Sequence, residues 1–294
     1  MSSMTPDVVV DAACELGEGP TWDAARQRLL WLDVDGLVLH QLDSAGRHTA
    51  TATKQRISAV VPDVNGNLVA VAGLSVAQID EFGHLGKTIA TLPPDGDGLA
   101  NDARCDPMGR LWVGTVDRSG EQQAGLFCVA DDGSVKKVRS GIALSNGIDW
   151  SPDGRICHYV DSLAHRVDTI HLDAEGLPIR SETLVHIGSI PDGLSVDAEG
   201  AVWVALWDGG AIHRYTPQGR LDRVVEVPGG FITSCAFGGP DLTTLFITTA
   251  RSGLPEAQLC TQPHAGALFA IDVGVSGRGY TPFGNPDRDK VGAA

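Results

Sequence analysis

The sequence predicts an all-β chain folded as a six-bladed β-propeller. A strand-turn-strand signal recurs six times, successive turns lie 40 to 46 residues apart, and a second alternating signal follows in phase with the first. A period of about 40–50 residues is the length of one four-stranded propeller blade. An irregular β-sandwich is the alternative, but it would give turns every 8–12 residues or so without this longer period. The six turns fall at Arg26, Gly66, Gly109, Gly154, Gly200 and Thr243.

The elements of the first and last repeats predict how the ring closes. In the first repeat we expect strands at 18–23, 29–34, 37–42 and 47–53. The last repeat is short of a fourth strand, because ALFAIDV at 267–273 is its third. The apolar segment VVVDAA at 8–13 precedes the first repeat. We expect this N-terminal strand to complete the last blade and close the ring, which removes two exposed sheet edges.

Composition favours one globular domain over residues 1–294. The chain has 36 glycines, as expected for a fold rich in turns, and no linker or low-complexity stretch interrupts the repeats. Its six cysteines include no CxxC pair. We therefore expect reduced, buried thiols instead of a disulfide framework or a zinc knuckle.

Charge narrows the class of partner. The formal net charge is −15, which argues against nucleic acid and against a membrane surface, because both attract clustered Lys and Arg. The N-terminus lacks the basic and apolar regions of a secretory signal, and no apolar run approaches the ~20 residues of a membrane span. We expect a cytoplasmic protein with neither partner.

One position recurs at the same place before each strand-turn-strand signal. If the repeats form a ring, these positions converge on its axis, and four of them carry a carbonyl or carboxylate oxygen while two carry hydroxyls. Such oxygens suit a hard divalent ion. The alternative is structural, since Asn and Asp also cap turns and line water-filled channels. The positions are Glu18, Ser58, Asn101, Asn146, Asp192 and Ser234.

Other catalytic signals are missing from the sequence. It contains no HxH or HExxH motif for zinc and no GxSxG elbow for a serine hydrolase. The glycine-rich segments at 95–98 and 274–279 do not join a strand to a helix, so they are not phosphate loops. The ring positions are therefore the candidate site.

The segments around the ring positions resemble the regucalcin (senescence marker protein) and gluconolactonase family of six-bladed propellers. The resemblance rests on ELGEGPTWD, NDARCDPMGRLWVGT, LSNGIDWSPDG and IPDGLSVDAEGAVWVA, and on two further segments near the C-terminus. It implies one divalent metal ion (Ca, Zn, Mg or Mn) held by Glu18, Asn146 and Asp192, with Asn101 lining the substrate site. It also implies a small-molecule partner, a sugar lactone that is hydrolysed to the aldonic acid.

The implied chemistry uses the metal to polarise the lactone carbonyl and to stabilise the oxyanion. Asp192 is the candidate general base, and a hydroxide ion on the metal is the competing means of attack; the sequence does not decide between them. Two other functions stay open: a different ester or phosphoester hydrolase on the same metal site, and a non-catalytic metal-binding propeller.

The sequence departs from the family at the substrate site. Many sugar lactonases carry NRxND, with Arg two residues before the position of Asn101, where this chain has Leu99. A family glutamate also has no counterpart, and Ser119 lies near its place. Among the equivalent slots only Arg56 is charged, and alternation along a strand would point it at the same mouth. Arg56 is therefore a candidate substrate-binding residue; the alternative is that it pairs with a surface carboxylate.

Overall fold

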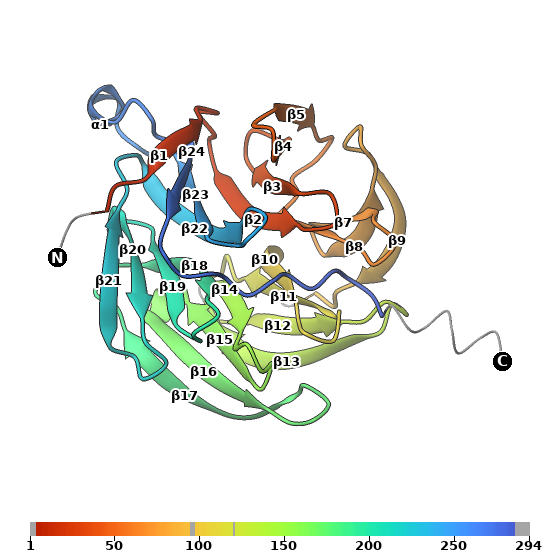
Figure 1. Cartoon of the computed structure of the whole chain (residues 1–294). Coiled ribbons are helices and arrows are strands. Elements are labelled where there is room, and N and C mark those ends of the chain that lie inside the picture. Colours follow the sequence, from red (N-terminus) through yellow and green to blue (C-terminus); the bar gives the residue numbers. More distant parts are fainter. Residues whose placement is uncertain (1–3, 95–97, 120, 286–294) are drawn as a thin grey trace.

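Six four-stranded antiparallel sheets surround a central axis in the computed structural model (Figure 1). It describes residues 4–94, 98–119 and 121–285. The first strands of neighbouring blades contact one another all the way around, from β2 to β6, β10, β14, β18, β22 and back to β2. The predicted six-bladed β-propeller is confirmed.

Each blade runs from its innermost strand outwards, and blade six borrows its outermost strand from the N-terminus. The strands, blade by blade, are β2 (Gly17–Asp23), β3 (Arg28–Asp33), β4 (Val38–Asp43), β5 (His48–Ala52); β6 (Ala59–Pro62), β7 (Leu68–Ala72), β8 (Ser75–Ile79), β9 (Leu85–Thr91); β10 (Leu99–Cys105), β11 (Leu111–Val116), β12 (Ala124–Val129), β13 (Val135–Ile142); β14 (Ser145–Trp150), β15 (Ile156–Asp161), β16 (Arg166–Leu172), β17 (Pro178–His186); β18 (Pro191–Val196), β19 (Val202–Leu206), β20 (Ala211–Tyr215), β21 (Leu221–Glu226); and β22 (Phe231–Gly238), β23 (Thr244–Ala250), β24 (Leu268–Asp272), β1 (Asp7–Val10).

The ring closes where the sequence predicts. Strand β1 pairs antiparallel with β24, with Val8 opposite Phe269 and Val10 opposite Leu268. Figure 1 shows the two strands side by side, although they come from opposite ends of the chain. This pairing covers the outer edge of β24, so the last blade has the same four strands as the others.

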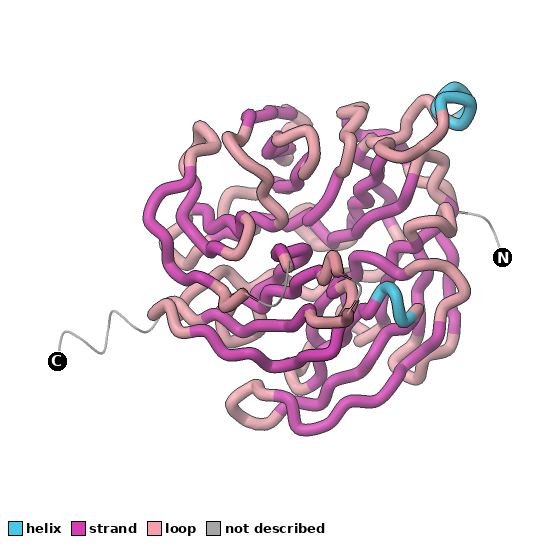
Figure 2. The backbone as a smooth tube through the Cα atoms, turned by 180° about the vertical axis from the view of Figure 1, so that it is seen from behind, coloured by secondary structure: helices cyan, strands magenta, loops and turns pink. Residues whose placement is uncertain are grey.

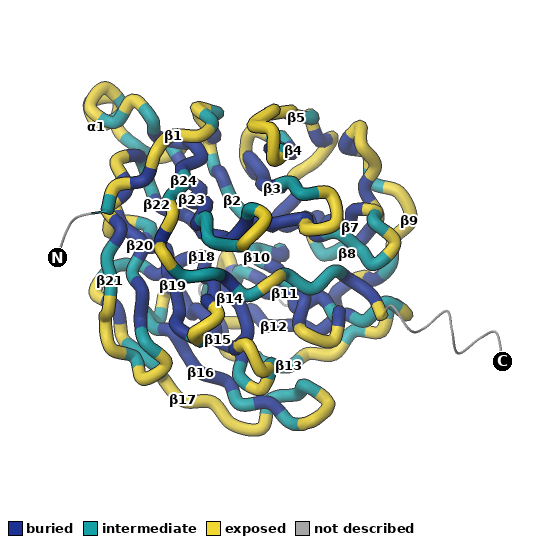
Figure 3. Tube along the Cα trace, in the orientation of Figure 1, coloured by how far each residue is buried: buried dark blue, intermediate teal, exposed yellow. Residues whose placement is uncertain are grey.

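The core lies between the faces of neighbouring blades. Innermost strands are buried, whereas outer strands such as β13 and β17 are mostly exposed (Figure 3). Tryptophans join adjacent blades: Trp112 meets Trp150 edge to face at 5.6 Å, and Trp203 meets Phe237 in the same way at 5.9 Å. The six cysteines are free, and all but Cys260 are buried.

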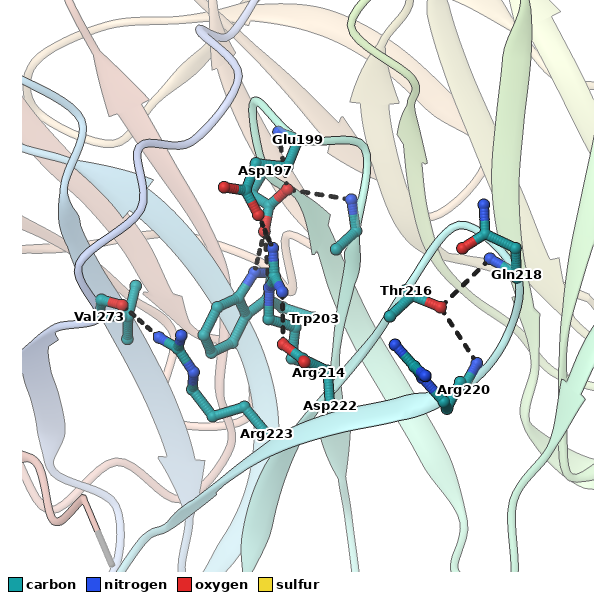
Figure 4. Close-up of polar contacts among 11 residues, drawn as sticks. Asp197, Glu199, Trp203, Arg214, Thr216, Gln218, Arg220, Asp222, Arg223 and Val273 are labelled. Atoms are coloured by element: carbon teal, nitrogen blue, oxygen red, sulfur yellow. Dashed lines mark hydrogen bonds and ion pairs between the residues drawn. The ribbon is translucent and has the colours of Figure 1, made fainter. Parts of the chain in front are cut away.

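The same pattern of hydrogen bonds to an aspartate carboxylate recurs in the first turn of more than one blade, and Asp197 shows it most fully (Figure 4). One carboxylate oxygen accepts hydrogen bonds from the Glu199 and Ala201 amides, and the other accepts one from the Trp203 indole at 2.9 Å. The buried Arg214 guanidinium pairs with the same carboxylate at 2.7 Å. Gly200 completes the turn with a φ of +80°, a backbone that glycine adopts without strain. The turn predicted at this glycine is confirmed.

The segment after β24 crosses one end of the ring (Figure 1). Gly277 bridges to Asp197 and Phe283 bridges to Asp63, and both partners lie just after innermost strands. The segment therefore covers the end at which the innermost strands leave the axis. The two short helices are η1 (Ser162–Ala164) and α1 (Glu256–Thr261). Across 4–94, 98–119 and 121–285, no helix is long and apolar enough to cross a membrane.

Candidate metal centre on the propeller axis

The four ring positions that carry a carbonyl or carboxylate oxygen share one cavity of about 240 Å³. Innermost strands begin at this end of the axis, so the cavity lies opposite the C-terminal segment, on the side seen in Figure 2. Ser58 and Ser234 do not line it. The lining residues are Leu16, Glu18, Asn101, Leu144, Asn146, Leu163, Ile190, Asp192 and Trp207.

β-Bulges in the innermost strands turn these side chains toward the axis. In β10, β14 and β18, two residues oppose one residue of the next strand, and the register shifts just after Ala100, Ser145 and Pro191. The extra residue in a bulge leaves the ladder and re-aims its side chain. Asn101, Asn146 and Asp192 fall within the bulges, which is why three neighbouring blades present polar groups to one point.

In blades four and five the residue that follows the ring position is a glycine, and neighbouring atoms leave no room for a side chain. A Cβ on Gly147 would lie 2.5 Å from the Leu194 amide nitrogen, and one on Gly193 would lie 2.0 Å from Ser234 Oγ. Only glycine fits there. Blade three instead carries Asp102 at this place. Asp102 was not among the predicted site residues, although it is the only acidic residue in the equivalent slot of the six repeats.

Three carboxylates meet at the cavity and its base, and they oppose one another's ionisation. Burial, then repulsion by Asp102, raises the pKa of Glu18 to about 8, against the hydrogen bond from Gly19 and the attraction of Arg56. Burial, then Glu18 and Asp102, raises the pKa of Asp192 well above its ordinary value. Burial also raises the pKa of Asp102 itself. A cation placed among these groups would relieve all three effects.

The donor set fits a divalent ion. Asp192 Oδ1 is buried and has no hydrogen-bond partner among the described residues, so this oxygen is available to bind an ion. No group of three His, Cys, Asp or Glu side chains in the described part of the chain is placed to hold a metal ion. The cavity lining instead combines the carboxylates of Glu18 and Asp192 with the amides of Asn101 and Asn146, and such an all-oxygen mixture suits calcium, magnesium or manganese.

A hydrogen-bond chain fixes the two amides. Asn101 Nδ2 donates to Asn146 Oδ1 at 2.8 Å and to the Ser145 carbonyl at 3.0 Å. Asn146 Nδ2 donates to Ser162 Oγ at 2.9 Å, and Ser162 Oγ donates to the Pro191 carbonyl at 2.6 Å. Both amide nitrogens are therefore bound to protein acceptors. The Asn146 oxygen accepts one of these hydrogen bonds and keeps its second lone pair for a cation.

An ionic network fills the axis below the cavity. The Asp149 carboxylate forms ion pairs with the guanidinium groups of Arg104 and Arg278, each at 3.0 Å. The Arg104 guanidinium also lies 4.7 Å from the centre of the Tyr280 ring. Burial alone would raise the pKa of Asp149, but the two guanidinium groups hold it below its ordinary value. Arg278 and Tyr280 come from the segment after β24. This segment closes one end of the axis, and the cavity opens at the other end.

Arg56 does not line the cavity. Its Nε donates to Asp35 at 3.1 Å, and both side chains are more than two-fifths exposed. The structure thus shows the surface ion pair that was the alternative for this residue, and its substrate-binding role stays a prediction. Ser119 is also turned elsewhere, since its Oγ donates to Asp117 at 2.7 Å.

The fold and the axial cavity define a class: a six-bladed propeller with carboxylate and amide oxygens in a pocket at one end of its axis. The chain belongs to the SMP-30/Gluconolactonase/LRE-like family, whose model matches residues 16–251.

Relatives cover nearly the whole chain. YvrE of Bacillus subtilis, named as a candidate sugar lactone lactonase, is 32% identical over 93% of this chain and 96% of its own. Human regucalcin is 31% identical over 96% of this chain and 99% of its own. The solved structure of a calcium-binding protein, regucalcin from Agrobacterium tumefaciens, superimposes with a TM-score of 0.87 at 31% identity, covering 96% of this chain and 99% of that one.

Proposed function

We propose that the chain is a metal-dependent lactonase that opens a cyclic ester to the corresponding hydroxy acid. The observation that carries this proposal is that the carboxylates of half-buried Glu18 and buried Asp192 line one cavity, where their raised pKa values favour a cation. Family membership and the name of the Bacillus relative support the lactone as the substrate class. The aldonic acid product and the sugar lactone follow from the family resemblance.

Glu18, Asn146 and Asp192 would hold the ion, which is calcium, zinc, magnesium or manganese. The name of the Agrobacterium relative supports calcium among these. When bound, the ion supplies positive charge that polarises an ester carbonyl and offsets the charge of the oxyanion. The protein's own contribution is a rigid set of oxygens, held by the Asn101–Asn146–Ser162 hydrogen bonds.

Asp192 is the proposed general base. Its Oδ1 has no partner among the described residues, so it can accept a proton from a water molecule in the cavity. The water oxygen bonds to the carbonyl carbon, the ring C–O bond breaks, and the proton passes from Asp192 to the departing ring oxygen. Asn101, beside Asn146 on the cavity wall, would line the lactone.

Chelation followed by re-addition of each ion tests the proposal. A panel of lactones is assayed by acid release, and ion affinity is measured by calorimetry. We expect Glu18→Gln, Asn146→Ala and Asp192→Asn each to weaken ion binding by at least the ~10–100-fold typical of outer-sphere changes, and to lower lactonase activity. Glu182→Gln is the matched control, because Glu182 is an exposed carboxylate on β17.

Two results would count against the proposal. Unchanged ion affinity in all three variants would show that the site is elsewhere. Ion binding without hydrolysis of any lactone would leave a non-catalytic metal-binding propeller, and esters and phosphoesters in the same panel would reveal another hydrolase.

A further inference from the structure

The mouth of the cavity is apolar. Above the oxygens of its floor, the wall consists of Leu16, Leu144, Leu163, Ile190 and Trp207. We infer that the substrate is a lactone carrying an apolar substituent, which lies against this wall. The inference rests on the proposed lactonase function and specifies which lactone the site takes.

The wall arises from the repeat. Leu16, Leu144 and Ile190 each occupy the slot two residues before a ring position, so three blades contribute an aliphatic side chain at one level. The one charged side chain in these slots, Arg56, pairs with Asp35 at the surface. Within the described residues, the polar side chains that line the cavity are Glu18, Asn101, Asn146 and Asp192, which are the floor groups already proposed to serve the ion and the reacting ester.

A polyhydroxylated ring would therefore lose water at several hydroxyls, and the wall offers at most one hydrogen-bond donor in return, the Trp207 indole N–H. Unpaired buried polar groups are costly, and sites that select hydroxylated substrates supply matching donors and acceptors. Burying an alkyl substituent against this wall is favourable, because it removes apolar surface from water.

Trp207 gives the wall a fixed flat surface. Its ring stacks on Phe231 with centroids 4.5 Å apart and planes 8° apart. The Trp207 amide donates to the Ile190 carbonyl at 2.9 Å, and the Ile190 amide donates to Asp208 at 2.8 Å. These bonds tie the two wall residues together before any substrate binds, so little order is lost on binding.

Leu163 forms the outer edge of the wall. It lies on η1 and is 58% exposed, yet it also lines the cavity. His165, two residues after Leu163, anchors the turn, because its Nδ1 lies 3.0 Å from the Ser189 carbonyl oxygen. Apolar surface thus continues from the floor to the solvent edge, which suits a substituent that extends outwards from the ester.

Three six-membered lactones test the inference: unsubstituted δ-valerolactone, its butyl-substituted counterpart δ-nonalactone, and glucono-1,5-lactone. A buried methylene contributes about fourfold in affinity, so burying three of the butyl carbons predicts a kcat/KM about 60-fold higher for δ-nonalactone than for δ-valerolactone. Trp207→Ala should lower kcat/KM for δ-nonalactone at least ~10-fold and for δ-valerolactone much less.

Leu163→Ala and Leu221→Ala form a matched pair, because both leucines are exposed and only Leu163 lines the cavity. We expect the first substitution to reduce the preference for the butyl lactone and the second to leave it unchanged. A second readout does not need turnover: calorimetry with the butyl-substituted δ-lactam, a slowly hydrolysed analogue, should show weaker binding in Trp207→Ala with unchanged ion affinity.

The outcomes separate the two proposals. A preference for glucono-1,5-lactone, or equal losses on all three lactones in Trp207→Ala, would overturn the inference and leave the lactonase intact. If no lactone is hydrolysed, the lactonase proposal fails, while lactam binding that depends on Trp207 would still support an apolar ligand. Lactam binding that is absent, or unchanged in Trp207→Ala, would overturn the inference.

Discussion

Binding of a divalent ion should release about one proton from Glu18 at pH 7. The buried Glu18 carboxyl has a pKa of about 8, so roughly nine-tenths of it is protonated at pH 7 before the ion arrives. A coordinating carboxylate must be ionised, and the proton must therefore leave. Asp192, whose pKa is also raised, adds to this number, so about 0.9 is the smallest release expected if Glu18 is a ligand.

Calorimetry in two buffers with different ionisation enthalpies measures this release directly. The chelated protein is titrated with the ion at pH 7, and the slope of the observed enthalpy against the buffer enthalpy gives the protons released. At about pH 9.5 the contribution of Glu18 should fall below about 0.1, because the group is already ionised. Asp102→Asn removes a repelling charge, which lowers the pKa of Glu18 and Asp192, so fewer protons should leave at pH 7.

Identical heats in the two buffers at pH 7 would refute this reasoning, because Glu18 would then be ionised before binding or would not bind the ion. Glu182→Gln should leave the slope unchanged, since the exposed Glu182 lies on an outer strand. If Asp102→Asn also left it unchanged, the repulsion assigned to that carboxylate would be wrong.

The same pKa shift affects stability. A folded-state pKa raised from 4.5 to about 8 means that folded Glu18 holds its proton more tightly than the unfolded chain does. The chelated protein should therefore lose stability as the pH rises from about 4.5 to about 8 and level off above that. Saturation with the ion should flatten this part of the profile, because the bound form of Glu18 is ionised throughout. Thermal unfolding at several pH values, with and without chelator, measures the difference.

Three further predictions concern the ring, the axial network and Arg56. Deleting residues 1–13 removes β1 and exposes the edge of β24, so the melting temperature of the whole ring should fall; a truncated protein that melts like the full chain would refute this closure model. Asp149→Ala leaves the buried Arg278 without its ion-pair partner and leaves Arg104 with only the attraction of Asp102, so the free energy of unfolding should fall by about 3–5 kcal/mol in denaturant titrations. Arg278→Ala should cost less, because Arg104 then keeps Asp149. Arg56→Leu should change kcat/KM for hydroxylated and alkyl lactones by the same factor if Arg56 acts only through its charge on Glu18; a large loss confined to hydroxylated lactones would support the substrate-binding role predicted from the sequence.

The architecture was predictable because its signals are local and repeated. Turn positions such as Gly109 and Gly200 need a positive φ, and both adopt one. The missing fourth strand of the last repeat and the apolar N-terminal segment together predicted the pairing of β1 with β24. Aligning the repeats also placed Glu18, Asn146 and Asp192 at equivalent positions, and the closed ring brings them into one cavity.

What the sequence did not reveal depends on departures from regular strands. Alternation along a strand would point Arg56 at the cavity, but β6 begins only at Ala59, so Arg56 precedes the strand and the pleat does not set the direction of its side chain. Asp102 was missed for the opposite reason. It lies in the bulge of β10 directly after Asn101, where strict alternation would have placed neighbouring side chains on opposite faces.

The layers along the axis explain why the cavity attracts a cation and yet remains folded. Glu18 and Asp192 face the cavity, and their charges are opposed by burial and by Asp102. Arg104, two residues further along β10, lowers the pKa of Asp102 against the effect of burial and also pairs with Asp149. The lower carboxylates therefore have cationic partners from the protein, while the upper pair is short of one. A divalent ion would supply the missing charge at the floor of the cavity, so the same imbalance of charge that destabilises the ion-free ring would direct the ion to this site.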